Sequence, residues 1–68
     1  MDRFTNLFAQ NIRICRKLAS TTQTDLSALT GITQNQIYRY ESGKQMPSCL
    51  ALSKIAKALS VDPGQFFY

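Results

Sequence analysis

The side chains best suited to chemistry in this sequence lie close together, between positions 34 and 39. They are two amides, a phenol and a guanidinium, namely Gln34, Asn35, Tyr38 and Arg39. An amide can pair with N6 and N7 of adenine, and an arginine can pair with O6 and N7 of guanine or bind a phosphate. The phenol could contact a thymine methyl group or donate its hydroxyl to a phosphate. The group could therefore read base edges in DNA, and the alternative is an ordinary solvated polar surface.

The remaining residue types offer little for catalysis or metal binding. The chain has no histidine, and its acidic residues are scattered over separate segments. The four acidic residues are Asp2, Asp25, Glu41 and Asp62. No acid–base or nucleophilic cluster can be built from them. Cys15 and Cys49 lack the spacing of metal ligands, and we expect two buried, reduced thiols rather than a disulfide. We predict that the protein is not an enzyme and that it holds no metal, cofactor or small-molecule ligand.

Two short helices joined by a tight turn would position the polar face. We predict helices over 23–30 and 34–42, with Gly31 in a left-handed turn between them. Each helix begins with residues that fit a capping box, in which a threonine oxygen accepts an amide hydrogen and a later side chain bonds back. The two pairs are Thr22 with Asp25 and Thr33 with Gln36.

The rest of the chain also reads as helix, since no useful segment alternates with the period of a strand. We predict helices over 5–19 and 49–59, and a short last helix that begins at Asp62-Pro63. Apolar residues at helical spacing predict the core. They are Phe8, Ile12, Cys15, Ala19, Leu26, Leu29, Ile32, Ile37, Tyr40, Leu52, Ile55, Ala56 and Leu59. A chain of 68 residues, 44% of them hydrophobic, fits one all-α domain over residues 1–68.

A longer pattern surrounds the two central helices. It reads Thr22-Gln23-x-x-Leu26, Gly31-Ile32-Thr33-x-x-x-Ile37, Tyr40-Glu41-x-Gly43 and Pro47. In this pattern the chain resembles the lambda-type phage repressor and Cro family of small bacterial and phage regulators, over about residues 8–67. The resemblance implies a five-helix, lambda-repressor-like DNA-binding fold with a helix-turn-helix at its second and third helices. The chain departs from the family at Ser27, where alanine is usual, but serine is also small and its hydroxyl can bond back to its own helix.

The resemblance also implies roles for single residues. Positions that match base-reading residues are Gln34, Asn35 and Arg39. Gln23 matches a glutamine that bonds a phosphate and braces the first base-reading side chain, here Gln34. Arg16 of the first helix would form an ion pair with Glu41, which docks the recognition helix onto the scaffold.

Two further sets of residues complete the predicted interfaces. The phosphate contacts are Arg13, Gln23, Thr33, Gln36, Lys44 and Gln45. Short members of the family dimerise through their C-terminal region, and the residues expected there are Leu50, Phe66, Phe67 and Tyr68. A dimer would place two recognition helices roughly 34 Å apart, in successive major grooves.

Together these observations predict a sequence-specific DNA-binding transcription regulator. We expect a repressor that binds a near-palindromic operator in double-stranded DNA as a homodimer, whether phage repressor-like or like a restriction–modification controller. The alternative is an antitoxin-type interaction module that binds DNA secondarily. A net charge of +4 and a pI near 9.4 fit a nucleic-acid partner without requiring one. No signal peptide and no apolar run near the roughly 20 residues of a membrane span are visible, so we predict a cytoplasmic protein.

Overall fold

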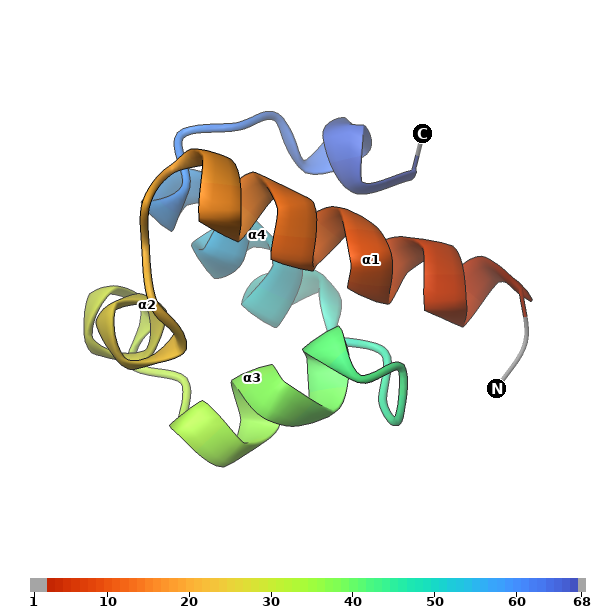
Figure 1. The fold of residues 1–68 in the computed structure, drawn as a ribbon, viewed down its shortest axis with the longest axis horizontal. Coiled ribbons are helices and arrows are strands. Elements are labelled where there is room, and N and C mark those ends of the chain that lie inside the picture. Colours follow the sequence, from red (N-terminus) through yellow and green to blue (C-terminus); the bar gives the residue numbers. More distant parts are fainter. Residues whose placement is uncertain (1–2, 68) are drawn as a thin grey trace.

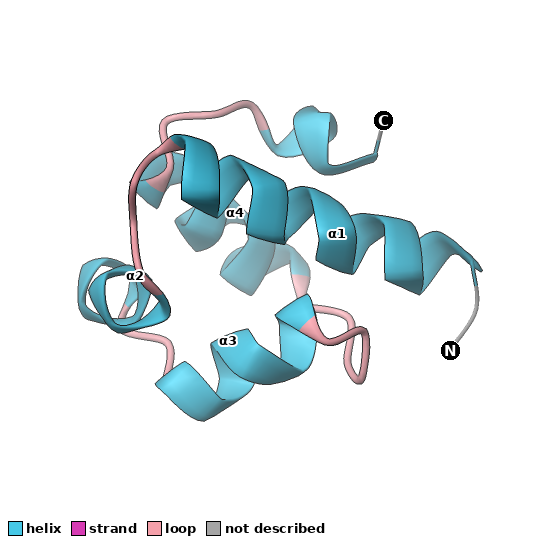
Figure 2. Cartoon of the chain, in the orientation of Figure 1, coloured by secondary structure: helices cyan, strands magenta, loops and turns pink. Residues whose placement is uncertain are grey.

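The computed structural model describes residues 3–67, apart from the side chains of residues 4 and 67, and this part of the chain is helical without a strand (Figure 2). The elements are α1 (Arg3–Leu18), α2 (Gln23–Thr30), α3 (Gln34–Glu41), α4 (Cys49–Ala58) and the 3-10 helix η1 (Pro63–Phe67). The last predicted helix is therefore a single short 3-10 segment, and the α-helices number four over the described residues. None of these helices is both long and apolar enough to cross a membrane.

α1 is the longest of the helices (Figure 1). α3 packs against α1 on one side, and η1 returns from the far end of the chain to lie against α1 on another. α2 packs against both α3 and α4, so that the two central helices are held by the helices before and after them. This arrangement leaves one long side of α3 without a covering helix (Figure 1).

The core draws large side chains from every helix. The largest fully buried side chains are Phe8, Ile12, Leu26, Ile37, Ile55 and Phe66. Burial of each such side chain stabilises the fold by about 1.5–3 kcal/mol. The rings of Phe8 and Phe66 lie 5.6 Å apart between centroids, and Asn11 Nδ2 donates to the carbonyl of Phe66 over 2.9 Å. These two contacts attach η1 to α1 although the residues involved lie at opposite ends of the sequence.

The start of each central helix follows its predicted cap. Thr22 and Asp25 form the full capping box, with Oγ1 accepting the Asp25 amide over 3.0 Å and the carboxylate accepting the Thr22 amide over 3.3 Å. At Thr33 half of the predicted box is present, because Oγ1 accepts the Gln36 amide over 3.2 Å and no return bond from the Gln36 side chain is made. Gly31 lies in the predicted left-handed conformation, with φ of 75°.

The turn between α2 and α3 is closed by two hydroxyl groups. Ser27 Oγ donates to the carbonyl of Ile32 over 2.6 Å, so this hydroxyl bridges the turn and does not bond to its own helix. Thr30 Oγ1 donates to the Leu26 carbonyl over 2.7 Å and accepts the Ile32 amide over 3.1 Å. These bonds satisfy backbone groups that the change of direction removes from the helix ladder.

Three helices end in a left-handed residue whose following amide bonds a carbonyl five residues back. The left-handed residues are Ser20 after α1, Gly43 after α3 and Ser60 after α4, with φ of 53°, 76° and 57°. This geometry is the Schellman motif, which glycine adopts at little steric cost and serine only with strain. Gly43 therefore closes α3 as its sequence position suggests, whereas α1 and α4 end on residues that cost free energy.

The core prediction is wrong at several positions. Leu29 is 64% exposed, because the buried position in the last turn of α2 is taken by Thr30. Ala19 is exposed because it follows the end of α1. Cys49 is exposed and Cys15 is half-buried, so the expectation of two buried thiols fails, and both thiols are free. Burial raises the pKa of the Cys15 thiol above its ordinary value.

Candidate nucleic-acid interface

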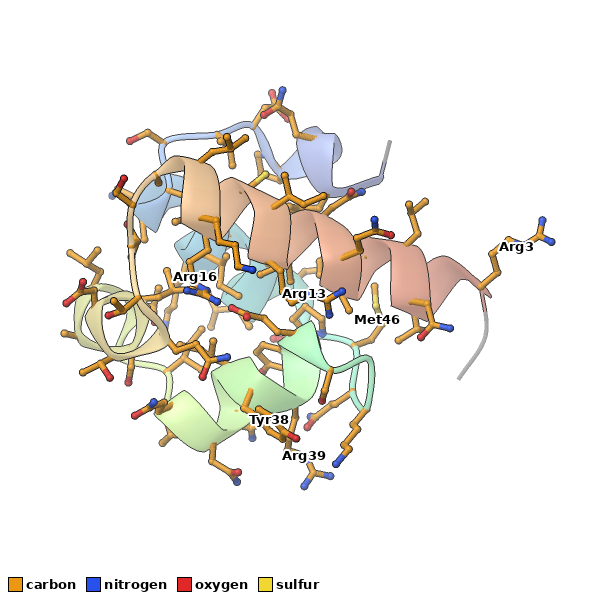
Figure 3. The ribbon with its side chains drawn as sticks, viewed as in Figure 1. Arg3, Arg13, Arg16, Tyr38, Arg39 and Met46 are labelled. Atoms are coloured by element: carbon orange, nitrogen blue, oxygen red, sulfur yellow. The ribbon has the colours of Figure 1, made fainter. Side chains whose placement is uncertain are left out.

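The side of α3 turned away from the core carries the residues predicted to read bases. All four are exposed, namely Gln34, Asn35, Tyr38 and Arg39. Ile37 and Tyr40 of the same helix are buried, which determines the face that turns outward. Figure 3 shows Tyr38 and Arg39 on the side of α3 that points away from α1. The helix thus presents amide and guanidinium donors and amide acceptors on an accessible surface.

An ion pair joins the last turn of α3 to α1, as the resemblance implies. Arg16 Nε lies 2.7 Å from Glu41 Oε2, and Arg16 Nη2 lies 3.0 Å from Oε1, so the guanidinium binds the carboxylate through two parallel bonds. The Glu41 side chain is 3% exposed and the Arg16 side chain 14% exposed. A third nitrogen of Arg16 donates to the carbonyl of Thr21 over 2.9 Å. Such a bidentate pair fixes both distance and direction, so it orients α3 on the scaffold.

Two further side chains converge on Glu41, although Arg13 was predicted to bind a phosphate, and Gln23 to bind a phosphate and brace Gln34. Gln23 Nε2 donates to Glu41 Oε1 over 3.1 Å, so the amide expected to brace Gln34 is held by the carboxylate, a charged and therefore stronger acceptor. Arg13 Nη1 donates to the main-chain carbonyl of Glu41, and Figure 3 shows both Arg13 and Arg16 reaching from α1 toward α3. The end of α3 is therefore tied to α1 and to the start of α2 at once.

An open pocket of about 230 Å³ lies beside this network, at the junction of α1, α2 and α3. Its lining residues are Arg13, Gln23, Tyr38, Glu41 and Ser42. Arg13 and Gln23 are half-buried, so part of each side chain remains accessible from the side of the exposed α3 face. The pocket can present N–H and hydroxyl donors to an anion while Glu41 is neutralised by Arg16.

The loop after α3 folds back toward the exposed face of α3. Lys44 Nζ lies 5.4 Å from the centroid of the Tyr38 ring, which is a cation–π contact between the loop and the helix. Lys44 and Gln45, which were predicted to bind phosphates, are exposed. Gly43 permits the turn that brings them there, and a Cβ at this position would lie 2.9 Å from Asn6 Oδ1.

The two polar residues at the start of α3 differ in accessibility. Thr33 is exposed and uses its oxygen as the helix cap. Gln36 is half-buried, and its Oε1 atom is buried with no hydrogen-bond partner among the described residues. Gln36 therefore faces the protein more than a residue dedicated to phosphate contact would. Over the described part of the chain, no group of three or more potential metal ligands accompanies these residues.

Comparison with known proteins places this geometry in a family. The family model for Helix-turn-helix, HTH_3, matches residues 12–66. The chain belongs to the HTH_3 helix-turn-helix family. This membership supports a role in DNA-binding transcription regulation. Enzymatic activity is not typical of such regulators.

Relatives and solved structures agree with the membership. An uncharacterized HTH-type transcriptional regulator, y4wC, from Sinorhizobium fredii is 38% identical over 85% of the chain, and the chain spans 41% of the length of that relative. The restriction–modification controller protein C.AhdI from Aeromonas hydrophila superposes with a TM-score of 0.89 at 27% identity, over 93% of this chain and 96% of that one. An HTH_3 family transcriptional regulator from Vibrio cholerae gives a TM-score of 0.87 at 26% identity, over 94% of this chain and 36% of its own.

The C-terminal residues of this HTH_3 chain only partly match the predicted dimer interface. Leu50 is 66% exposed at the start of α4, where a partner could cover it. Phe66 is fully buried against Phe8 in its own protomer, so its assignment to the interface is wrong. The Phe67 side chain and Tyr68 lie outside the described residues, and their assignment stays a prediction.

Two of the contacts that were not predicted join Glu41 to distant segments, and a third joins α3 to the loop that follows it. Arg13 lies three residues before Arg16, on the same face of the helix, and this spacing could have suggested a shared partner. The Gln23–Glu41 bond carries no local signal, because an amide at the start of α2 can equally face solvent. The Tyr38–Lys44 contact depends on the path of the loop after Gly43, which sequence spacing does not describe.

Proposed function

We propose that this HTH_3 chain is a sequence-specific DNA-binding transcription regulator that inserts α3 into the major groove. The observation that carries the proposal is the combination on one helix of an exposed polar face and a buried anchor. Gln34, Asn35 and Arg39 are exposed, while Glu41 at the end of the same helix is buried and bound by Arg16. A helix that must match base edges needs both accessible side chains and a fixed orientation. Each good bidentate base contact contributes about 1–3 kcal/mol of discrimination.

Affinity would come from phosphate contacts around this helix. Arg13 and Gln23 line the pocket beside the recognition face, and Lys44 and Gln45 follow it on the exposed loop. The N-terminus of α2 offers its free amides next to Gln23, where a helix dipole favours an anion. Thr33 and Gln36 belong to the same proposed set, in which Gln36 is half-buried, as are Arg13 and Gln23. These contacts set register and salt dependence without reading sequence.

Tyr38 would serve both parts of the interface. Its ring carries Lys44 on one face, and half of the residue remains exposed on the side of α3 that would face a groove. The hydroxyl can donate to a phosphate, while the ring edge can meet a thymine methyl group. Either contact places Tyr38 between the bases read by α3 and the backbone bound by the loop.

We further propose that the protein acts as a homodimeric repressor on a near-palindromic operator. The exposed Leu50 supports a protein–protein contact near the C-terminal part of the fold, and the likeness to a restriction–modification controller protein supports a regulator of this size. A repressor that blocks polymerase by occupying its operator needs no further protein-interaction surface. An acidic activating surface finds little support, since over residues 3–67 the acids are Asp25, Glu41 and Asp62, and Glu41 is buried.

Selection of bound duplexes from a randomised DNA pool tests these proposals. We expect enrichment of a two-fold symmetric motif with half-sites about one helical turn apart. Salt-sensitive binding with no enriched motif would contradict base reading by α3. Enrichment of a single asymmetric half-site would contradict the homodimer but keep the recognition helix.

Single substitutions then separate the two kinds of contact. Gln34→Ala and Asn35→Ala should each relax one base position and cost about 1–3 kcal/mol on the selected site. Lys44→Ala should weaken binding to all sequences alike and reduce the salt slope by about 0.9. Lys17→Ala, an exposed lysine on α1 outside the proposed set, is the matched control and should leave the sequence preference unchanged.

A further inference from the structure

A second groove, of about 350 Å³, lies between the last turn of α2 and the second half of α4. Its lining residues are Leu29, Thr30, Lys54, Lys57 and Ala58. All five come from α2 and α4, so the groove is separate from the outward face of α3 and from the pocket beside Glu41. The proposed DNA contacts use none of these residues.

The groove combines a positive rim with an apolar wall. Lys54 and Lys57 lie three residues apart on one face of α4, and both are exposed. Leu29 is 64% exposed on the opposite wall, an unusual exposure for a leucine that helical spacing would assign to the core. Ala58 extends the same apolar surface.

The polar side-chain atom inside the groove already has its hydrogen-bond partners, so it needs none from a ligand. Thr30 is buried, and its hydroxyl already donates to the Leu26 carbonyl and accepts the Ile32 amide. Recognition is therefore left to the two ammonium groups and the apolar wall. Because the lining set contains no acidic residue, the positive charge of the lysines is not offset within the groove.

We propose that this groove docks an acidic amphipathic helix of a protein partner. Two carboxylates about one turn apart would meet Lys54 and Lys57, and an apolar side chain beside them would cover Leu29 and Ala58. Helix-in-groove binding uses this combination of an apolar anchor and complementary charge at its rim.

Two other occupants fit the groove less well. A DNA backbone would satisfy the lysines but would leave the leucine wall uncovered, since it offers phosphates without an apolar side chain. A second copy of this chain has few acids to offer. Over residues 3–67 they are Asp25 and Asp62, because Glu41 is buried in its pair with Arg16. Within the described residues a second copy thus supplies few acids, and we assign the acidic helix to a different protein.

The test uses a displayed library of short helical peptides, selected on the purified full chain. We expect enrichment of peptides that carry two acidic residues one turn apart next to Leu or another large apolar residue. Binding of a selected peptide, followed by fluorescence anisotropy, should weaken about tenfold or more in Lys54→Glu combined with Lys57→Glu, because like charges then face each other. Leu29→Ala should weaken it as well, through loss of the apolar anchor.

Matched controls on α1 have the same residue types at exposed positions outside the groove. Lys17→Glu and Leu18→Ala should leave peptide binding unchanged, Leu18 being 81% exposed. Because all the substituted side chains are largely exposed, thermal unfolding should show that each variant remains folded. Equal loss of peptide binding in the control and groove variants would overturn the proposal, as would a selection that enriches no acidic helix.

The same variants distinguish the other occupants. If Lys54→Glu with Lys57→Glu abolished duplex DNA binding and left the peptide bound, the groove would belong to the DNA interface and the proposal would be wrong. If it converted a dimer to a monomer in sedimentation, the groove would be an interface between copies, which also overturns it. The peptide assay contains no DNA, so its outcome is independent of the proposed operator binding.

Discussion

Replacement of Glu41 by glutamine tests how much the buried ion pair contributes to the fold. Glu41 accepts two hydrogen bonds from Arg16, at 2.7 and 3.0 Å, and one from Gln23 at 3.1 Å. Glutamine keeps one acceptor oxygen and turns an NH₂ group toward these donors, so at least one charge-assisted bond is lost. A hydrogen bond to a charged group contributes about 1.5–3 kcal/mol, and a fully buried ion pair broken on one side costs about 3–5 kcal/mol.

The expected cost of Glu41→Gln lies between these limits, at about 2–4 kcal/mol, because Arg16 keeps its bond to Thr21 and is 14% exposed. A chain of this size has a total stability of roughly 3–10 kcal/mol, so the loss is a large share of it. The melting temperature should fall by about 10–30 °C, at roughly 4–8 °C per kcal/mol.

Urea unfolding followed by circular dichroism measures this loss directly. The control removes the whole pair, through Arg16→Met combined with Glu41→Leu, and should recover much of the stability, because no buried charge is then left without a partner. A free energy of unfolding for Glu41→Gln within about 0.5 kcal/mol of that of the unmodified protein, a difference typical of surface substitutions, would contradict a stabilising role of the ion pair. A double replacement less stable than the single one would contradict it as well.

Three further predictions concern helix ends and thiols. Ser20→Gly should stabilise the protein by about 1 kcal/mol in thermal unfolding, since glycine adopts the left-handed conformation without strain. An unchanged melting temperature would refute backbone strain at position 20. Gly31→Ala and Gly43→Ala should each cost about 1–2 kcal/mol in the same assay through left-handed strain, since the close contact of a Cβ at position 43 is with the flexible end of the exposed Asn6 side chain, which can shift; an unchanged stability in either variant would contradict this strain. Alkylation followed by mass spectrometry should modify Cys49 first and Cys15 slowly, because burial protects Cys15 and raises its pKa, which lowers its thiolate fraction. The raised pKa also means that any stability linked to Cys15 is present at neutral pH and is lost as the pH rises through that pKa. Equal alkylation rates in the folded protein would contradict the protection of Cys15, and a free energy of unfolding that stays constant through that pKa would contradict the linkage.

Features that depend on neighbouring residues could be predicted from the sequence. The positions of the four α-helices agree with prediction within about one turn at their ends, since caps and turns are formed by residues next to each other. Thr22 with Asp25 and the left-handed Gly31 define the helix-turn-helix in this way. The family resemblance supplied the pair of Arg16 with Glu41, which local chemistry alone would not have linked.

Only the tertiary structure determined which of several similar side chains are buried. It also determined which partners these side chains contact. Leu29 and Thr30 are adjacent in α2, and the packing of α2 against α4 buries the threonine and leaves the leucine at a groove. Phe66 returns to the core because η1 lies against α1, and Gln23 meets Glu41 because α2 packs directly against α3. The physical reason is the same in each case. Hydrogen bonds within one turn are determined by adjacent residues, whereas burial depends on surfaces that are brought together only when the whole chain has folded.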